Sequence, residues 1–289
     1  MLDIRQSMDY ASFLSKDGWK VERFNNTNYF LRKLPILGSV LKLQRPKLID
    51  FKKIEEIQKR NRVFLTIIEP NLETTFVNTN HFDHSLLLHH GFKLAKSTYL
   101  PSKTIQIDLT KAKNEIYANF SKSARYSIKR GEGLKIKEYS SLKEIEIFHN
   151  AWKKSVNFNR YVPSLKTLLN LKKSFPHNHS IFLASHNKSS RIIGGAIFTI
   201  SSHDSTNYIT YYMYGFTNKE GRTSLSQYSL LYSGILWGKS QGCKLFDMEG
   251  IFDERFPNKS WLGFSHFKKQ FGGSIVTYPG CYTKYSIFK

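Results

Sequence analysis

Cysteine is almost absent from this chain of 289 residues, which contains only Cys243 and Cys281. The two form no CxxC pair, so a zinc ribbon or a dithiol redox site is excluded. No run of about 18 apolar residues occurs, so no membrane-spanning helix is predicted. Charges at Asp3, Arg5 and Asp9 interrupt the N-terminal segment, so we expect no signal peptide there. A protein of the reducing cytosol fits these absences.

Acidic side chains are scarce relative to basic ones. Asp and Glu number 22 against 44 Lys and Arg, which gives a formal net charge of +22. An excess of this size indicates a polyanionic partner, such as nucleic acid, a phosphorylated small molecule or an anionic membrane face. Because 40% of the residues are hydrophobic, including 22 Phe, the chain can bury a core and is not disordered.

Apolar periodicity predicts two blocks of mixed helices and strands. The first block has expected helices at 3–16, 47–60 and 80–90, and expected strands at 19–24, 28–33, 38–44, 63–68 and 92–99. The second has expected strands at 104–109, 180–186, 191–200, 206–216, 244–247 and 274–288, and expected helices at 111–118, 121–131, 141–157, 164–174, 223–240 and 261–270. This order favours an α/β (α+β) fold in two units.

Several segments, taken in order, resemble the Fem (FemABX) aminoacyltransferases. They are Gln6-Ser7 with Gly18-Trp19-Lys20-Val21, Arg45-Pro46, Gly91-Phe92, TIQIDL at 104–109, the basic stretch 123–130, and the C-terminal stretches 242–251, 261–263 and 267–273. Two departures are visible. The family's Arg-Gly-Pro segment lacks its glycine here, and the second half shows no heptads for a coiled-coil arm, so the chain resembles a minimal member.

The resemblance implies two tandem GNAT-like domains, with the fold of acyl-CoA N-acyltransferases. These would be residues 1–103 and 104–274, with 275–289 returning to the first domain. It also implies transfer of Gly, Ala or Ser from aminoacyl-tRNA to the stem-peptide amine of UDP-MurNAc-pentapeptide or lipid II, which builds the interpeptide bridge of the cell wall. The ester is already activated, so no covalent enzyme intermediate is required, and no cofactor is expected. The basic surface would also suit peripheral contact with the anionic inner membrane face.

Two residues near the C-terminus, Lys268 and Phe267, are assigned by the resemblance to the 3′ end of tRNA. Lys268 would stabilise the developing oxyanion, and Phe267 would offer its ring to Lys268 or to the terminal adenosine. The alternative is a surface lysine beside a core phenylalanine on an amphipathic helix. Glu69 resembles an acidic position and would act as general base, or would be a solvated turn carboxylate. Asp247 and Glu249 are expected to cap the turn that follows their strand.

The remaining candidates would bind substrate. Arg160 and Tyr228 resemble positions that contact the acceptor's diphosphate or peptide, where a guanidinium can bind two phosphate oxygens together. Arg45 would take the place of a phosphate-binding lysine that this chain lacks in its first domain. Arg125 and Lys129 lie on one basic stretch and would contact phosphates. A packed ring for Tyr228 and a solvated helix face for the basic pair fit equally well.

No metal site is predicted, because His81, His84, His89 and His90 have no Cys or carboxylate partners at a familiar ligand spacing.

Two other classes of function stay open. One is an N-acyltransferase that uses acyl-CoA or acts on another amine, such as a lipid head group or a protein N-terminus. A CoA enzyme needs backbone N–H groups around the pyrophosphate, and residues 215–224 contain only Gly221-Arg222 of the usual glycine-rich pattern. The other is a non-catalytic RNA-binding module, for which no RNP-type, KH or zinc pattern is present.

Overall fold

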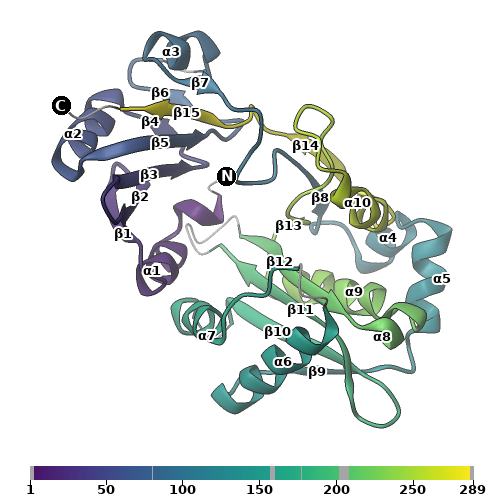
Figure 1. The fold of residues 1–289 in the computed structure, drawn as a ribbon. Helices are drawn as coiled ribbons and strands as arrows, with labels where there is room; N and C mark the ends of the chain where they lie inside the picture. Colours follow the sequence, from purple (N-terminus) through teal and green to yellow (C-terminus); the bar gives the residue numbers. More distant parts are fainter. Residues whose placement is uncertain (1–2, 80, 157–159, 177, 202–207, 287–289) are drawn as a thin grey trace. The chain divides into compact units, whose positions relative to one another are not determined.

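The computed structural model describes residues 3–79, 81–156, 160–176, 178–201 and 208–286 (Figure 1). The chain forms two compact units. The first comprises Met1–Lys103, Phe252–Ser260 and Val276–Lys289, and the second comprises Thr104–Ile251 and Trp261–Ile275.

Residues 252–260 belong to the first unit, whereas the sequence analysis placed them in the second domain. Side-chain bonds explain the difference. The Ser102 hydroxyl donates to the Asp253 carboxylate at 2.7 Å, and Arg255 donates to the Tyr278 carbonyl at 2.9 Å. These bonds join the segment to the end of the first stretch and to the C-terminal return, neither of which is adjacent to it in the sequence.

The first unit is built on a six-stranded sheet in the order β1-β2-β3-β5-β15-β7. Its elements are η1 (Ile4–Gln6), α1 (Met8–Lys16), β1 (Lys20–Phe24), β2 (Thr27–Leu34), β3 (Gly38–Gln44), β4 (Leu48–Ile49), α2 (Phe51–Asn61), β5 (Val63–Glu69), β6 (Thr75–Phe76), α3 (His84–His89), β7 (Lys93–Leu94) and β15 (Tyr282–Tyr285). Strands β3 and β5 are parallel, with Gln44 paired to Glu69, so both end at the same edge of the sheet.

Helix α2 shows how local signals set an element's limits. The Asp50 carboxylate accepts the Lys53 N–H at 3.0 Å, and Arg62 ends the helix in the left-handed region. Helix α2 therefore begins four residues after the start of the helix predicted at 47–60, because residues 48–49 form strand β4 and pair with β6. Helix α3 is likewise shorter than the predicted 80–90, because Asp83 caps it.

The second unit has a seven-stranded sheet in the order β14-β8-β13-β12-β11-β10-β9. Its elements are β8 (Lys103–Asp108), α4 (Lys113–Ala118), α5 (Lys122–Arg130), β9 (Lys135–Glu138), α6 (Leu142–Ser155), α7 (Leu165–Ser174), β10 (Ser180–His186), β11 (Ile192–Ile200), β12 (Ile209–Thr217), α8 (Lys219–Thr223), α9 (Ser226–Ser240), β13 (Leu245–Asp247), α10 (Leu262–Lys269) and β14 (Ser274–Thr277), and the short η2 (Lys259–Trp261) begins in the first unit and ends in the second. Strand β9 was not predicted, since only Ile136 in it is partly buried. Residues 206 and 207 of the predicted strand 206–216 lie outside the described residues.

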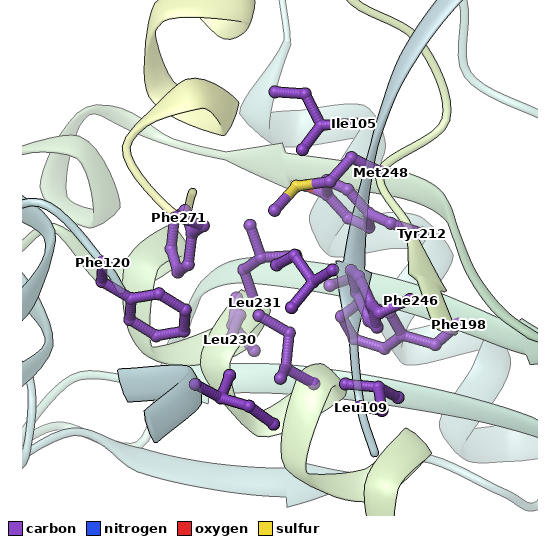
Figure 2. Packing of buried hydrophobic residues seen from close by; sticks show 14 of the residues in the cluster. Ile105, Leu109, Phe120, Phe198, Tyr212, Leu230, Leu231, Phe246, Met248 and Phe271 are labelled. Atoms are coloured by element: carbon purple, nitrogen blue, oxygen red, sulfur yellow. The ribbon is translucent and has the colours of Figure 1, made fainter. Parts of the chain in front are cut away.

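The core of the second unit lies between helix α9 and the sheet. Phe198, Leu230, Leu231 and Phe246 are all fully buried in one cluster (Figure 2). A β-carbon on Gly234 would come within 2.3 Å of the Phe198 ring, so a glycine is what allows α9 to approach β11. Burial of each large side chain stabilises the unit by about 1.5–3 kcal/mol.

Each sheet is completed by a strand from a distant part of the chain. Strand β15 lies between β5 and β7, with Thr283 paired to Ile67 on one side and to Lys93 on the other. In Figure 1 it is the yellow strand among blue ones. Strand β8 lies between β13 and β14. Along the sequence, more than half of the second unit separates β8 from these two strands. Neither sheet therefore forms from one continuous segment.

The mixed α/β architecture in two units confirms the predicted fold class. Within the described residues, no helix combines the length and apolar character needed to cross a membrane.

Candidate functional site

The first candidate site lies where two parallel strands of the second unit part. Strands β12 and β13 pair from Ile209 opposite Leu245 to Tyr211 opposite Asp247. There β13 ends, while β12 continues to Thr217. The Lys268 ammonium lies 5.4 Å from the ring centroid of Tyr212, the first residue past this point. A positive charge is thus placed where the sheet opens.

Lys268 is held there by the main chain. Its Nζ donates to the carbonyl oxygens of Met248 at 2.6 Å, Glu249 at 3.0 Å and Gly250 at 2.8 Å. The side chain is only 6% exposed, and burial lowers the pKa of Lys268 to about 8. The alternative of a surface lysine is therefore wrong, and the three ammonium protons have acceptors within the protein.

The loop that receives Lys268 has an unusual backbone. Glu249 and Gly250 both have positive φ, at 52° and 94°. The left-handed conformation costs a non-glycine residue such as Glu249 about 1 kcal/mol or more. In this backbone conformation, three successive carbonyl oxygens accept hydrogen bonds from one ammonium group.

Asp247 anchors the start of this loop. Its carboxylate accepts the Glu249 N–H at 2.8 Å, the Thr104 hydroxyl at 2.6 Å and the Gln106 amide at 2.9 Å. Burial and, to a smaller extent, the nearby Glu249 charge raise the pKa of Asp247 to about 6, although these hydrogen bonds act to lower it. Asp247 caps the turn as predicted, whereas Glu249 supplies the left-handed residue within it.

Phe267 and Tyr228 belong to an aromatic cluster. Their rings meet edge to face at 4.8 Å, and both contact Phe271. The Tyr228 hydroxyl donates to the Gln270 side chain at 3.3 Å, and the half-buried rings pack against the core. Both rings are therefore packed, as the alternative interpretations of Phe267 and Tyr228 predicted.

Of the two contacts predicted for the Phe267 ring, the one with Lys268 is wrong, and the one with the terminal adenosine of tRNA stays a prediction. The Lys268 ammonium lies over the rings of Phe264, at 5.1 Å, and Tyr212. The reason is helical geometry, because residues four apart share a face of α10 and adjacent residues do not.

The basic candidates of the second unit are dispersed. Arg125 donates through Nη1 to the carbonyls of Ala118 and Phe120, so one of its nitrogens satisfies the end of α4. Lys129 and Arg160 are exposed. Within the described residues, no hydrogen bond or ion pair joins these three to Lys268, Phe267 or Tyr228.

A second candidate site lies at the shared edge of β3 and β5 in the first unit. Glu69 is 1% exposed, and its Oε1 accepts the backbone N–H groups of Tyr99 at 2.8 Å and Leu100 at 2.6 Å. Its Oε2 is buried without a hydrogen-bond partner among the described residues. Burial raises the pKa of Glu69, opposed by these bonds and by the charges of Arg45 and Lys42. The solvated-turn alternative is wrong, and a buried carboxyl of this kind suits acid–base chemistry.

Arg45 lies beside Glu69 but offers little to a ligand. Its backbone N–H donates to the Glu69 carbonyl at 2.8 Å, and its guanidinium donates to the carbonyls of Pro70 and Pro101. The guanidinium also stacks 3.6 Å from the Tyr278 ring centroid, and the residue is 3% exposed. The predicted phosphate contact is not supported by this geometry, because the donors are used to join strand ends.

Sequence reasoning missed Lys42. Its ammonium lies between the rings of Trp19, at 5.0 Å, and Tyr99, at 4.8 Å. Burial lowers the pKa of Lys42, and the Glu69 charge opposes this. The available signal was a lysine within the apolar run of β3, which places it on a covered face.

The stretch between β12 and α9 uses several of its backbone N–H groups internally. Four backbone N–H groups here have internal acceptors, those of Gly221, Arg222, Ser224 and Leu225. They are used to form α8, which Asn218 caps with its side chain. A β-carbon on Gly221 would lie 2.1 Å from the Ile193 carbonyl oxygen, so this turn is also pressed against β11.

The histidine-rich segment has local partners. His84 Nδ1 lies 2.8 Å from the Tyr282 hydroxyl, and His90 stacks on Phe51. His81 precedes α3, so it does not share a helical face with His84. The described residues contain no group of three or more His, Cys, Asp or Glu able to hold a metal ion.

Comparison with known proteins found similarity in three dimensions only. No protein-family model and no curated protein matches the chain. The crystal structure of FemX is 14% identical, with a TM-score of 0.77 over 98% of this chain and 92% of FemX. The C-terminal domain of a putative lysylphosphatidylglycerol synthetase from Agrobacterium fabrum is 12% identical, with a TM-score of 0.60 over 97% of this chain and 88% of that one. A tandem GNAT protein from the clavulanic acid biosynthesis pathway is 9% identical, with a TM-score of 0.56 over 96% and 87%. The chain thus has a FemX-like fold of two GNAT-like domains, as predicted.

Proposed function

We propose that this chain is an aminoacyltransferase that moves Gly, Ala or Ser from aminoacyl-tRNA to the stem-peptide amine of UDP-MurNAc-pentapeptide or lipid II. The FemX-like fold over 98% of the chain supports the class of enzyme. The observation that carries the choice of donor is that the N–H groups of Gly221, Arg222, Ser224 and Leu225 already have acceptors, because a CoA enzyme needs such groups for the pyrophosphate. The net charge of +22 suits tRNA as the donor.

In the proposed reaction, the neutral acceptor amine attacks the ester carbonyl, the bond from the carbonyl carbon to the 3′ oxygen of tRNA breaks, and a proton passes from the attacking nitrogen to that oxygen, which leaves as a hydroxyl. Lys268 fixes the 248–250 loop and keeps a positive charge at the opening between β12 and β13, where negative charge on a carbonyl oxygen would be stabilised. Glu69 is the proposed general base that takes a proton from the ammonium group of the acceptor before the attack, because its Oε2 is unpartnered and its pKa is raised.

Substrate contacts are proposed for exposed groups of the second unit. Lys129 and Arg160 are exposed and available to phosphates of tRNA or of the acceptor, and the half-buried Tyr228 is proposed to contact the peptide.

A lipid acceptor is the second candidate. The lysylphosphatidylglycerol synthetase domain shares the fold over 97% of this chain, so an aminoacyl group could pass to a phospholipid head group instead. The donor would be the same, and only the acceptor would differ.

A transfer assay separates these functions. The purified chain would receive tRNA charged with radiolabelled Gly, Ala or Ser, with UDP-MurNAc-pentapeptide, lipid II or phosphatidylglycerol in parallel reactions and acetyl-CoA as the competing donor. Label in a muropeptide would support the proposal, and label in phosphatidylglycerol would support the second candidate. Acetyl transfer without any aminoacyl transfer would refute both.

Glu69→Gln tests the proposed base within the same assay, because glutamine keeps the oxygen that accepts two N–H groups. Its matched control is Glu55→Gln, on the exposed face of α2 in the same unit. We expect a loss of about 100-fold or more only for Glu69→Gln.

A further inference from the structure

The turn between β2 and β3 exposes two aliphatic side chains. Ile36 is 104% exposed and Leu37 is 62% exposed, in a three-residue connection that Pro35 begins. The Leu37 N–H donates to the Pro35 carbonyl at 2.8 Å, so Ile36 stands at the apex. Aliphatic residues at a hairpin tip gain nothing from burial in the folded monomer.

Ile36 is also strained. Its φ is +69°, a conformation that is rare and costly for a β-branched residue. Two contacts of the following residues hold the turn in this conformation. The Ser39 N–H donates to the Arg62 carbonyl oxygen at 2.9 Å, and a β-carbon on Gly38 would lie 2.3 Å from the same oxygen. The turn is therefore fixed against the end of α2. Neither the strain nor the exposure of Ile36 is offset within the described contacts of the unit.

Basic side chains line the hollow beside this turn. The turn borders a hollow of about 780 Å³, whose described lining contains four basic side chains and no carboxylate. The four are Lys20, Lys33, Arg60 and Arg62. Glu22 forms ion pairs with Lys20 and Arg60, while no ion pair of Lys33 or Arg62 is found among the described residues, and both are exposed.

We propose that this turn is a docking site for an anionic lipid membrane. Ile36 and Leu37 would enter the interface between head groups and acyl chains, while Lys33 and Arg62 contact lipid phosphates. Aliphatic side chains flanked by unpaired cations match such a surface in both polarity and charge, and a soluble anion would give the exposed aliphatic pair no role. The inference does not depend on the transfer reaction proposed above.

The position of the turn is compatible with a working site elsewhere in the first unit. Gly38 and Glu69 mark opposite ends of the parallel pair β3 and β5. Seven residues of extended strand separate the two ends by about 20 Å. Docking by the turn therefore leaves the edge that carries Glu69 uncovered.

The test is co-sedimentation of the full-length chain with vesicles of phosphatidylcholine and phosphatidylglycerol at 70:30, against pure phosphatidylcholine. We expect Ile36→Ser/Leu37→Ser to weaken binding to the anionic vesicles on the order of tenfold. Lys33→Gln/Arg62→Gln should weaken it by about fivefold for each cation.

Matched variants in the second unit control for general charge and hydrophobicity. Leu142 and Ile147 are 60% and 54% exposed, so Leu142→Ser/Ile147→Ser is the counterpart of the aliphatic pair. Lys143→Gln/Lys166→Gln removes the same charge from exposed positions. Both controls should keep vesicle binding within about twofold of the wild type.

Ile36→Gly gives a second signature, because glycine accepts positive φ without strain. We expect its melting temperature to stay level or rise while vesicle binding falls at least threefold. Loss of binding in the turn variants alone, with their melting temperatures kept, would support the proposal. Equal binding by turn and control variants, equal binding to neutral vesicles, or no binding by the wild type would overturn it.

Discussion

Replacing Lys268 by methionine tests whether its ammonium holds the 248–250 loop. Methionine keeps the length and most of the volume of the side chain but removes all three donors. The carbonyls of Met248, Glu249 and Gly250 would then lose their shared partner. We expect the second unit to be destabilised whatever the role of Lys268 in catalysis.

The expected magnitude follows from two opposing contributions. Three hydrogen bonds to a charged donor contribute about 1.5–3 kcal/mol each, or about 5–9 kcal/mol together. The lowered pKa of Lys268, from 10.5 to about 8, corresponds to a net penalty of about 3 kcal/mol for the charged form in the folded protein, in which burial outweighs the attraction of Glu249 and Asp247. The net cost of Lys268→Met is therefore about 2–6 kcal/mol. For a unit of this size that lowers the melting temperature on the order of 10 °C.

Urea unfolding followed by circular dichroism measures this cost, and Lys269→Met is the matched control. Lys269 is the next residue of α10 and is exposed, so its replacement should change the free energy of unfolding by less than about 0.5 kcal/mol. If Lys268→Met stays within about 1 kcal/mol of the wild type, the three carbonyl contacts do not stabilise the fold and the reasoning fails.

The wild type and Lys268→Met should also differ in how their free energy of unfolding depends on pH. The folded pKa of Lys268, about 8, lies below its ordinary value of 10.5. The unfolded chain therefore binds more protons between those values, and stability contributed through this group rises with pH across that window. Lys268→Met should lack this rise, and an identical pH profile for the two proteins would contradict it.

Three further predictions concern the strands and carboxyls. The folded pKa of Asp247, about 6, lies above its ordinary 3.8, so the stability it contributes is lost as pH rises from about 4 to 6, by about 3 kcal/mol; Asp247→Asn should flatten this slope in pH-dependent unfolding, and an unchanged slope would assign it to other groups. Thr283→Pro, within a strand paired on both sides, should cost about 3 kcal/mol or more; hydrogen exchange should quicken in β5 but not in β11, and unchanged exchange in β5 would show that its sheet does not need β15. Glu69→Ala, which leaves two N–H groups without an acceptor, should lower the free energy of unfolding by about 2–5 kcal/mol more than Glu69→Gln, whereas equal unfolding curves would show that those bonds contribute nothing.

The sequence by itself determined which segments become helices and strands wherever one face is buried and a cap is local. Helix α6 is an example, because Ser141 and Glu144 form a capping box before a stripe that includes Ile145 and Phe148. Such signals lie within a few residues of the element that they define, so periodicity reports them directly. Short or exposed strands such as β9 carry no such pattern and were missed.

Only the tertiary structure decided the partners of the charged candidates. The acceptors of Lys268 lie 18 to 20 residues before it, and the two N–H groups bonded to Glu69 lie 30 and 31 residues after it. The strands that complete each sheet come from still more distant parts of the chain. A lysine or glutamate at the surface has the same local sequence as a buried one, because its burial depends on what the rest of the chain places over it. For that reason the sequence indicated the chemistry, and the fold alone showed which charged groups are anchored and which remain exposed.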